Sequence, residues 1–559
     1  MTIRATPQCQ GQPWPRSASP EARTDFAPIG RALPPTDPGL ADPNSHLSWE
    51  VSPAHTLRRC KTSQNLTGAK LPQIRRSLAR AWHLTLALRI SEAHELVDRI
   101  EWQLDDLSSN DAESLRAATQ LLRAASLALA DDNLAAHAIG LPLLEDNTPS
   151  RQRYIASTLC RLGFWKLGNF DAFHALPRHE PGARASKSEA MSAMFDLSIE
   201  AAAALDRLQL STAKRLSCDA LMISRTANLA KGPACLPISI AAQTLYEEGC
   251  LDEADELLRK HLPIINTQGS IECALRAYLV LARIARHRMG YDLAAILLRE
   301  GEVLGERRGW PRLVAACLAE RVALLLEAGQ SKEARLSMEN LDRHADSRGF
   351  GPRHSCSEIA QYRALARWRV SWAEAPSPQG AAQLRQLYHR ALDRQMFYGA
   401  CRLAVELAQA LTSIGEREQA DALFLHTVKL GAGAGLYQVF VEKADAAGAL
   451  LRRAYDAVEA PGSSDREILP FLGSLLSRWN ARHKKQGPTP STIAVSDALT
   501  PREHNILDKV SQGMANKRIA RALEISPETV KSHVKRIFLK LAVSTRAEAV
   551  SRGKSLGLL

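Results

Sequence analysis

The sequence predicts an all-α protein, in which an α-solenoid of two-helix repeats precedes a small helix-turn-helix domain of four helices. Three observations lead to this prediction. Alanine and leucine are abundant while only 5% of the residues are aromatic, a composition that favours helices. Turn signals recur at a fixed interval through the middle of the chain, as they do in repeat proteins. The C-terminal residues contain short helix patterns with recognisable start signals.

Changes in composition divide the chain into four expected parts. Residues 1–72 are rich in Pro, Ser, Thr and Gly and lack periodic apolar patterning, so we expect them to be disordered. Residues 73–480 carry the helical patterning of the solenoid, which we expect to be a sensor or interaction region. Residues 481–494 contain prolines and form the expected linker, and residues 495–559 form the expected C-terminal helix-turn-helix domain.

The solenoid prediction rests on a repeat of about forty residues. Turn residues at Gly168, Gln209, Gly249, Gly290 and Gly329 follow one another at intervals of 39 to 41 residues, and weaker copies begin near positions 88 and 131. The next turn signal, at position 415, lies 86 residues beyond Gly329, so this gap should hold two units. An alanine follows most of these turns by four or five residues. Two helices per unit of this length are typical of an α-solenoid.

The C-terminal block reads as three short helices with marked boundaries, followed by a fourth. Thr500 can cap the first helix and Glu503 can complete a capping box with it. Gly513 ends that helix, and a second one follows over about 516–523. Ser526 caps the third helix after a turn of only a few residues, so helices two and three form a helix-turn-helix at about 514–533. The fourth helix is expected over about 545–556.

The third helix of this block has two different faces. One face is apolar and consists of Val530, Val534, Ile537, Phe538 and Leu541. The other face carries polar and basic side chains, namely Lys531, Ser532, Lys535 and Arg536. Lysines four residues apart project from the same side of a helix, so this pair can enter one groove and reach guanine O6 and N7.

Four further side chains are expected to contact DNA without reading bases. Thr529, Lys517 and Lys540 are placed for phosphates, which position a protein on DNA but carry no sequence information. His533 is expected to pack or to contact a phosphate rather than to catalyse. The alternative interpretation of the whole basic face is a solvated helix surface, which is the usual role of a charge run.

Local charge favours a nucleic-acid partner over a merely solvated face. Residues 495–559 contain twelve lysines and arginines and six aspartates and glutamates, a formal net charge of +6. This is half of the formal +12 of the whole chain. Positive charge concentrated around a groove-sized helix is typical of nucleic-acid binders.

This C-terminal block resembles the DNA-binding domain of LuxR-type bacterial transcription regulators. In that family the lysine of the Thr-Val-Lys run, the next residue and the lysine of His-Val-Lys face the bases, which implies Lys531, Ser532 and Lys535 here. One small departure is Ala515, where serine is usual. The resemblance is carried by Leu499, Thr500, Pro501, Arg502, Glu503, Gly513, Asn516, Lys517, Ile519, Ala520, Ile525, Ser526, Thr529, Val530, Lys531, His533, Val534, Lys535, Lys540, Leu541, Val543, Arg546, Ala549 and Val550.

The helical repeats resemble the tetratricopeptide-like superhelix of large LuxR-family regulators of the MalT type. The run at 436–441, followed by Leu450 and Leu451, is similar to the closing repeat of those proteins. Those regulators also carry an N-terminal nucleotide-binding domain. This sequence contains no Gly-x-x-x-x-Gly-Lys-Ser/Thr phosphate loop, so ATP dependence is not carried over and we expect no cofactor.

Other classes of protein find little support in the sequence. The ten cysteines are scattered singly with no Cys-x-x-Cys pair, so we expect neither a metal site nor a redox dithiol. Paired carboxylates and a nucleophile elbow are absent as sequence patterns, so we expect no catalytic residues and no enzyme. There is no secretory segment and no run of eighteen apolar residues, so we expect a cytoplasmic protein without a membrane partner.

Together these patterns predict a bacterial sequence-specific transcription regulator. Its partners are double-stranded DNA, bound as a homodimer on a two-fold site, and an effector on the solenoid, either a small molecule, a peptide or a protein. RNA polymerase is a further candidate partner. The alternative is a helical scaffold that holds protein partners and binds DNA only secondarily.

Overall fold

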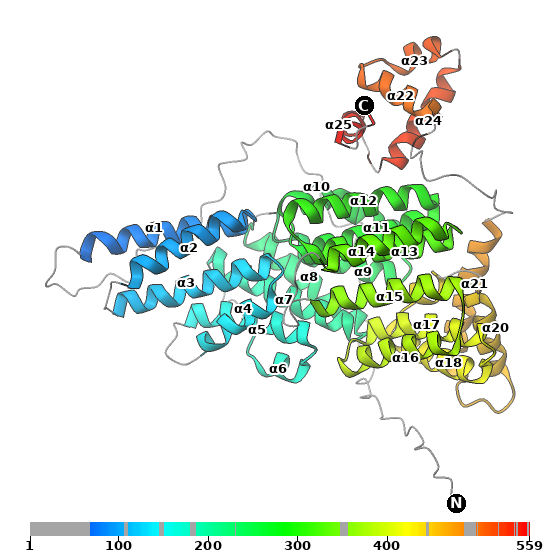
Figure 1. Ribbon diagram of the computed structural model, residues 1–559, viewed down its shortest axis with the longest axis horizontal. Coiled ribbons are helices and arrows are strands. Elements are labelled where there is room, and N and C mark those ends of the chain that lie inside the picture. The colour runs from blue at the N-terminus through cyan, green and yellow to red at the C-terminus, as the bar shows by residue number, and fades with distance from the viewer. Residues whose placement is uncertain are drawn as a thin grey trace, which may run out of the picture. The chain divides into compact units, whose positions relative to one another are not determined.

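The computed structural model describes residues 67–105, 110–144, 150–178, 186–229, 231–346, 356–442, 446–485, 499, 501–523, 525–541, 543, 546–555 and 558–559. Within these ranges every regular element is a helix, which confirms the all-α prediction (Figure 1). Residues 1–66 and 486–498, which include most of the expected N-terminal segment and linker, lie outside the described residues.

The helices before residue 486 pair consecutively along the chain. The first seven helices are α1 (Thr67–Leu86), α2 (Ile90–Asp105), α3 (Asn110–Leu129), α4 (Asn133–Gly140), the 3-10 helix η3 (Leu141–Leu144), α5 (Ser150–Leu167) and α6 (Phe170–Ala175). The central pairs are α7 (Lys187–Asp206) with α8 (Leu210–Thr226), α9 (Cys235–Glu247) with α10 (Leu251–Gln268), α11 (Ile271–Met289) with α12 (Tyr291–Arg308), and α13 (Pro311–Glu327) with α14 (Ser331–Asp346). The last elements are α15 (Cys356–Glu374), α16 (Pro378–Asp393), α17 (Phe397–Ser413), α18 (Arg417–Ala434), α19 (Gln438–Val441), α20 (Ala446–Glu459), η4 (Arg466–Ile468) and α21 (Leu469–Lys485).

The turns inside the pairs repeat one local geometry. At Gly249 the backbone has φ of +82°, and the next amide, that of Cys250, donates to the carbonyl of Leu245 at 2.8 Å. Such a left-handed residue with this bond closes a helix and reverses the chain. A positive φ also occurs at Leu88, Asp131, Gly168, Leu208, Gly290, Gly329 and Gly415, although Gly290, with ψ of −169°, is not left-handed helical. Turns therefore occur near the predicted positions, including the weaker copies, and the turn predicted at Gln209 has its positive-φ residue one position earlier.

The alanines after the turns occupy the positions that the repeat predicts. They are fully buried where the second helix of each pair crosses its neighbour, as at Ala93, Ala213, Ala254, Ala334 and Ala420. The predicted extra unit in the long gap is also present, since the α15–α16 pair lies between α14 and α17. Its turn contains no glycine; instead Ser377 caps α16 by accepting from the amide of Gly380.

Two pairs depart from the repeat because their second helix is cut short. Helix α4 has eight residues and is followed by Pro142, while α6 has six and is followed by Pro177. After α4 the chain continues into the 3-10 helix η3, with Leu141 in right-handed helical backbone. After α6 the proline favours extended backbone at the residue before it. Leu176 has that extended conformation.

Charged side chains link parts of the array that are distant in sequence. Arg312, on α13, is only 1% exposed and donates to Asp131 at 2.7 Å and to Glu358 at 2.7 Å. It also donates to Glu272, which pairs with Lys166 at 2.6 Å. This cluster, hereafter the Arg312 cluster, joins five helices or turns of the array through buried ion pairs.

The pKa values of the carboxyl groups in the Arg312 cluster depend on two opposing effects, burial and the nearby positive charges. Burial works against ionisation of Glu358, but Arg312 and Lys166 outweigh it and lower the pKa of Glu358 to about 2. For Asp131 burial prevails over Arg312, and the pKa of Asp131 is raised. The arginine therefore holds a set of carboxylates that could not stay buried without it.

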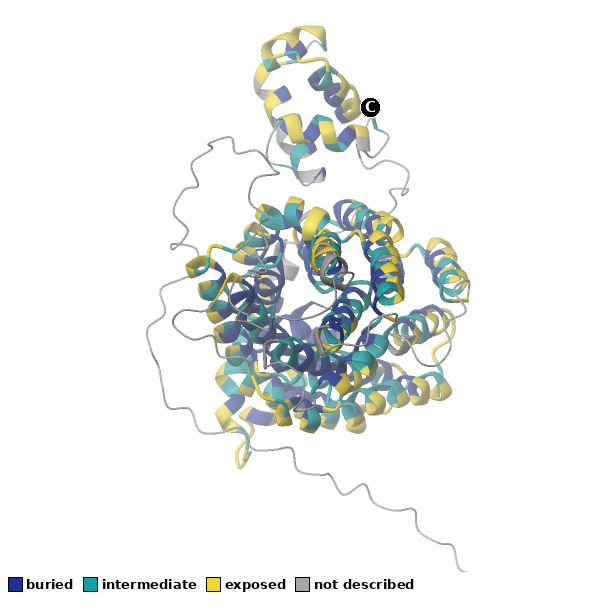
Figure 2. Cartoon of the chain, turned by 90° about the vertical axis from the view of Figure 1, so that its left-hand side faces the viewer, coloured by how far each residue is buried: buried dark blue, intermediate teal, exposed yellow. Residues whose placement is uncertain are grey.

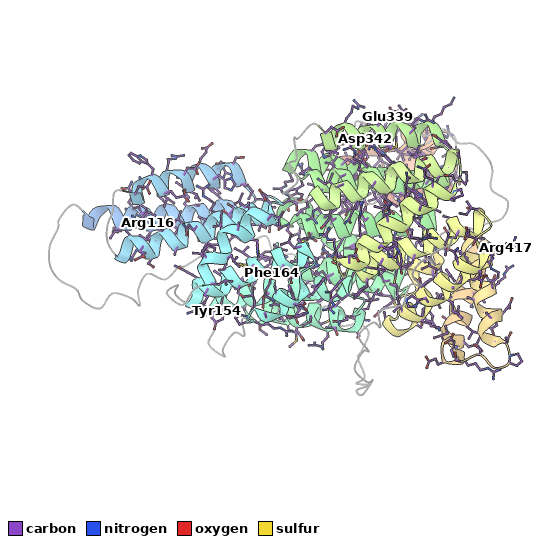
Figure 3. The ribbon with its side chains drawn as sticks, turned by 60° about the horizontal axis from the view of Figure 1, so that its bottom comes forward. Arg116, Tyr154, Phe164, Glu339, Asp342 and Arg417 are labelled. Carbon is purple, nitrogen blue, oxygen red and sulfur yellow. The ribbon has the colours of Figure 1, made fainter. Side chains whose placement is uncertain are left out.

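Buried residues gather where the helices of the array face one another (Figure 2). Exposed ion pairs lie on its outside. Asp342, on α14 and labelled in Figure 3, accepts hydrogen bonds from Arg363 and Arg367 on α15. Polar pairing thus occurs both at the surface and inside the array, with different consequences for stability.

The C-terminal block consists of four helices with their own small core. These are α22 (Pro501–Ser511), α23 (Asn516–Ala522), α24 (Pro527–Lys540) and α25 (Arg546–Ser555). Its hydrophobic core contains Leu499, Ile506, Leu507, Val510, Ile519, Ala520, Val530, Val534, Ile537, Leu541 and Ala549. The order and bounds of the four helices agree with the prediction to within a residue or two.

Candidate nucleic-acid interface

Helices α23 and α24 form the predicted helix-turn-helix. Helix α23 ends at Ala522 and α24 begins at Pro527, so the connection is short. The hydroxyl of Ser526 accepts the backbone N–H of Thr529 at 3.0 Å, which is the predicted N-cap. Gly513, with φ of +76°, closes α22 as predicted. The expected partner of Glu503, Thr500, lies outside the described residues, and Glu503 itself is buried.

The apolar face of α24 is turned into the domain core. Val530, Ile537 and Leu541 are at most 1% exposed, and Val534 is 9% exposed. Phe538 is half-buried and packs against the same core. A helix that buries one stripe presents the opposite stripe outward, and Lys531 on α24 is exposed accordingly.

Side chains are described for half of the predicted contact residues. Lys517, Thr529 and Lys531 are exposed, and His533 is half-buried. The side-chain hydroxyl of Thr529 also lies 2.8 Å from that of Ser526, so this residue takes part in the cap of α24. His533 Nδ1 is buried and meets no hydrogen-bond partner among the described residues, an environment suited to packing.

The other predicted contact residues lie in α24, but their side chains are outside the described set. These residues are Ser532, Lys535, Arg536 and Lys540. Helix α24 is continuous from Pro527 to Lys540, so positions 531 and 535 are about one turn apart on the same side of it. The predicted base-reading pair thus shares one helix face, as the sequence pattern requires.

Two arginines support this arrangement, although the sequence pattern gave them no role. Arg546, at the start of α25, donates to the Asn516 side chain at 3.0 Å and to the carbonyl of Met514. Burial lowers the pKa of Arg546. Arg502, on α22, donates to the carbonyl of Leu523 at 2.7 Å. Both ends of α23 are therefore hydrogen-bonded to other helices of the domain. These bonds hold α23 in place beside α24.

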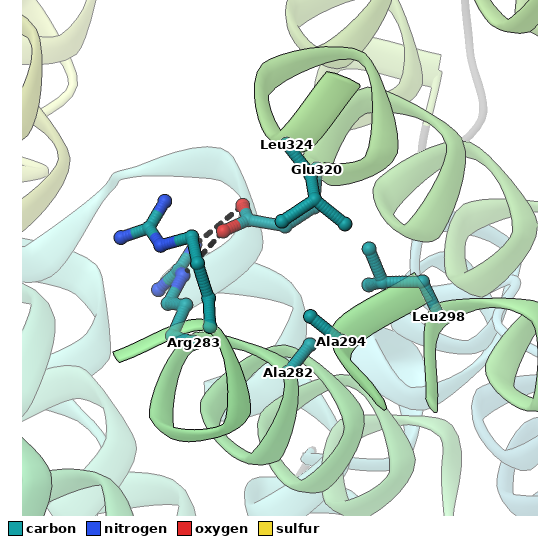
Figure 4. Close-up of a pocket in the computed structure, with 7 residues that line it drawn as sticks. Ala282, Arg283, Ala294, Leu298, Glu320 and Leu324 are labelled. Atoms are coloured by element: carbon teal, nitrogen blue, oxygen red, sulfur yellow. Dashed lines mark hydrogen bonds and ion pairs between the residues drawn. The ribbon is translucent and has the colours of Figure 1, made fainter. Parts of the chain in front are cut away.

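No alternative site of comparable definition occurs in the described parts of the chain. The described residues contain no group of three or more metal-binding side chains, and none of their helices is long and apolar enough to cross a membrane. A cavity of about 10 Å³ lies between α11, α12 and α13 (Figure 4). This volume is about what one water molecule needs. An open groove between α20 and α21 is lined by Tyr455, Leu476 and Asn480.

A capped helix-turn-helix with exposed lysines, here Lys517 and Lys531, is typical of a DNA-binding domain. Residues 497–552 match the family described as bacterial regulatory proteins, luxR family. The C-terminal block is therefore a LuxR-family helix-turn-helix domain, as the sequence resemblance implied.

The helical array is similar in fold to a protein of known structure. The structure of a Rap protein in complex with competence and sporulation factor superposes with a TM-score of 0.50. The match covers 65% of this chain and 99% of the Rap chain at 14% sequence identity. The array thus has a tetratricopeptide-like helical repeat fold, which confirms the prediction for this region.

Proposed function

We propose that this protein is a cytoplasmic transcription regulator that binds specific DNA sequences through α24. The observation that carries this proposal is the capped helix-turn-helix, in which α24 buries Val530, Val534 and Ile537 and turns Lys531 outward. Lys531, Ser532 and Lys535 read bases, while Lys517, Thr529, His533, Arg536 and Lys540 contact phosphates or support the reading helix.

The helical array binds a peptide or protein effector, and this binding changes the affinity of the C-terminal domain for DNA. Support comes from the fold, since the Rap protein of similar fold is in complex with competence and sporulation factor. A solenoid also offers the extended concave surface that suits such partners. The proposed array of residues 73–480 extends a few residues further at each end, since α1 begins at Thr67 and α21 ends at Lys485. Residues 495–559 form the proposed DNA-binding unit, and the proposed linker lies between the two.

On DNA the protein acts as a homodimer bound to a two-fold site. Helix-turn-helix domains of this type read one half-site each, and half-sites lie about one helical turn of DNA apart. RNA polymerase is the proposed further partner of the DNA-bound dimer.

Selection from a random pool of DNA duplexes tests the proposal. The full-length protein should enrich one pseudo-palindromic sequence, and a variant with both Lys531→Ala and Lys535→Ala should enrich none. The rival function, a helical scaffold with secondary DNA binding, predicts retention of duplexes without enrichment of any sequence.

A further inference from the structure

A short segment of the chain is buried between α9, α17 and α21 of the helical array. It comprises Leu436 to Glu442 and includes the four-residue helix α19. Leu436 and Phe440 are 0% exposed, and Glu442 is 4% exposed. Phe440 packs edge-on against Phe424 with ring centroids 6.0 Å apart. Burial of a polar carboxylate at the end of an apolar segment requires a specific partner.

The partners of the Glu442 carboxylate are three arginines from two helices. Arg286, on α11, donates to Oε1 at 2.8 Å, and Arg402, on α17, donates to Oε2 at 3.1 Å. Arg283 Nε, also on α11, lies 3.7 Å from Oε1. All three arginines are largely buried. Guanidinium groups converging on one carboxylate are the usual way in which proteins recognise that group.

The same segment is bonded to the array through its backbone. The amide of Tyr437 donates to the carbonyl of Glu247, the last residue of α9, at 2.8 Å. The carboxyl group of Glu247 in turn accepts the hydroxyl of Tyr398, on α17, at 2.5 Å. A backbone hydrogen bond to the array and a carboxylate held by arginines are contacts that a bound peptide can also make.

The inside of the array leaves little room beside this segment. The nearby cavity lined by Arg283, Arg286 and Glu320 has a volume of about 10 Å³, and Arg283 is paired there with Glu320 (Figure 4). Buried polar atoms of Tyr246, Glu247 and Arg286 meet no hydrogen-bond partner among the described residues. A ligand carboxylate that pairs with Arg286 and Arg402 would take the position that the Glu442 carboxylate occupies.

We propose that Arg283, Arg286 and Arg402 form a carboxylate-binding site whose tethered occupant is Glu442, and that a peptide effector with a free carboxylate competes with residues 436–442 for this site. The competition with an effector rests on the proposed function of the array, whereas the carboxylate site rests on the geometry alone. Tethering gives Glu442 a high effective concentration, so an external peptide must bind well to displace it.

Chemical rescue tests the carboxylate site. The variant Glu442→Ala leaves a space beside the three arginines, and acetate should raise its unfolding temperature by several degrees relative to chloride at equal ionic strength. Glu442→Gln fills the space with a neutral group and should gain nothing from acetate. Leu436→Ala, which weakens the same segment through an apolar contact, should also gain nothing. If Glu442→Ala is insoluble in chloride, the yield of refolded protein in acetate against chloride gives the same answer.

Equal responses to acetate in the three variants would overturn the carboxylate site, whatever the protein does with DNA. A synthetic peptide with the sequence of residues 436–442 tests the competition. The Glu442→Ala variant should bind this peptide at least about tenfold more tightly than a control peptide that ends in glutamine amide. The control peptide lacks the carboxylate and so loses a charged hydrogen bond. The peptide of residues 436–442 should also bind the unaltered protein more weakly than Glu442→Ala. Equal affinities of both peptides, or of both proteins, would refute the competition.

Discussion

The helical array and the C-terminal domain differ in the kinds of side chain that they bury. The core of the C-terminal domain is a cluster of apolar side chains, and Glu503 is the one charged residue buried among the described residues of that domain. The array has an apolar core as well, but it also buries Arg312 and Glu442 with their partners. Apolar packing tolerates many sequences, whereas a buried ion pair demands its particular partner. The comparison therefore predicts that the stability of the array depends most on single buried charged residues. The stability of the DNA-binding domain should depend most on single buried apolar residues.

The largest effect should follow from loss of the charge at the centre of the Arg312 cluster. Arg312→Ala leaves Asp131, Glu272 and Glu358 buried without their main cation, and should cost about 3–5 kcal/mol in the free energy of unfolding of the array. Denaturant unfolding followed by circular dichroism measures this loss. Arg363→Ala is the matched control, since Arg363 pairs with Asp342 near the surface. That variant should lose at most about 1 kcal/mol, and equal losses in the two variants would contradict a role for burial.

Acid should weaken the array through the same cluster. The pKa of Glu358 is lowered to about 2, so this carboxylate contributes stability above its unfolded pKa of 4.5. That contribution is lost as the pH falls from about 4.5 towards 2.

A carboxyl group elsewhere in the array should show the opposite pH dependence. Burial raises the pKa of Glu247 to about 7, against the opposing effects of Arg402 and the Tyr398 hydroxyl. The folded state therefore prefers the protonated form, and the contribution of Glu247 to stability is present below about pH 4.5 and lost as the pH rises to about 7. The total change is about 3 kcal/mol.

Glu247→Gln isolates this effect, because glutamine is neutral at every pH. The stability of the variant relative to the unaltered protein should increase between pH 5 and pH 8, as measured by thermal unfolding at each pH. A difference that stays constant across this range would show that Glu247 is ionised in the folded protein.

The matching test of the apolar domain is Val534→Ala. Val534 packs against the core from α24, so its truncation should cost about 1–3 kcal/mol through lost contacts. Hydrogen exchange of the full-length protein should become faster in α22, α23 and α24 and remain unchanged in α11 and α13. Faster exchange in both regions would contradict the separation between the two kinds of core.

Local signals in the sequence predicted the turns and the helix boundaries well. A glycine such as Gly249 marks a left-handed turn because few other residues adopt that conformation at low cost. The alanine four or five residues later, and the cap at Ser526, are equally local. Short-range rules therefore determined the repeat and the helix-turn-helix.

The buried ion clusters could not be predicted because their members are far apart in the chain. Arg312 and Asp131 are separated by 181 residues, and Arg286 and Glu442 by 156. In a sequence each of these residues is indistinguishable from a solvated charge on a helix. The contact of Arg546 with Asn516 was hidden for the same reason, although both residues belong to the family pattern. The proposed base-reading residues come from that pattern and from helical spacing, and they remain predictions.

The affinity for matched and scrambled DNA duplexes at several salt concentrations tests the central claim most directly. Lys535→Ala should cost about 1–3 kcal/mol on the selected sequence and relax the preference at one or two positions, and Lys531→Ala should act similarly. Lys517→Ala, on α23, should weaken binding to all sequences about equally and reduce the salt dependence by about one unit. Equal losses on both duplexes for Lys531→Ala and Lys535→Ala would contradict the claim, because they would show that α24 holds phosphates without reading bases.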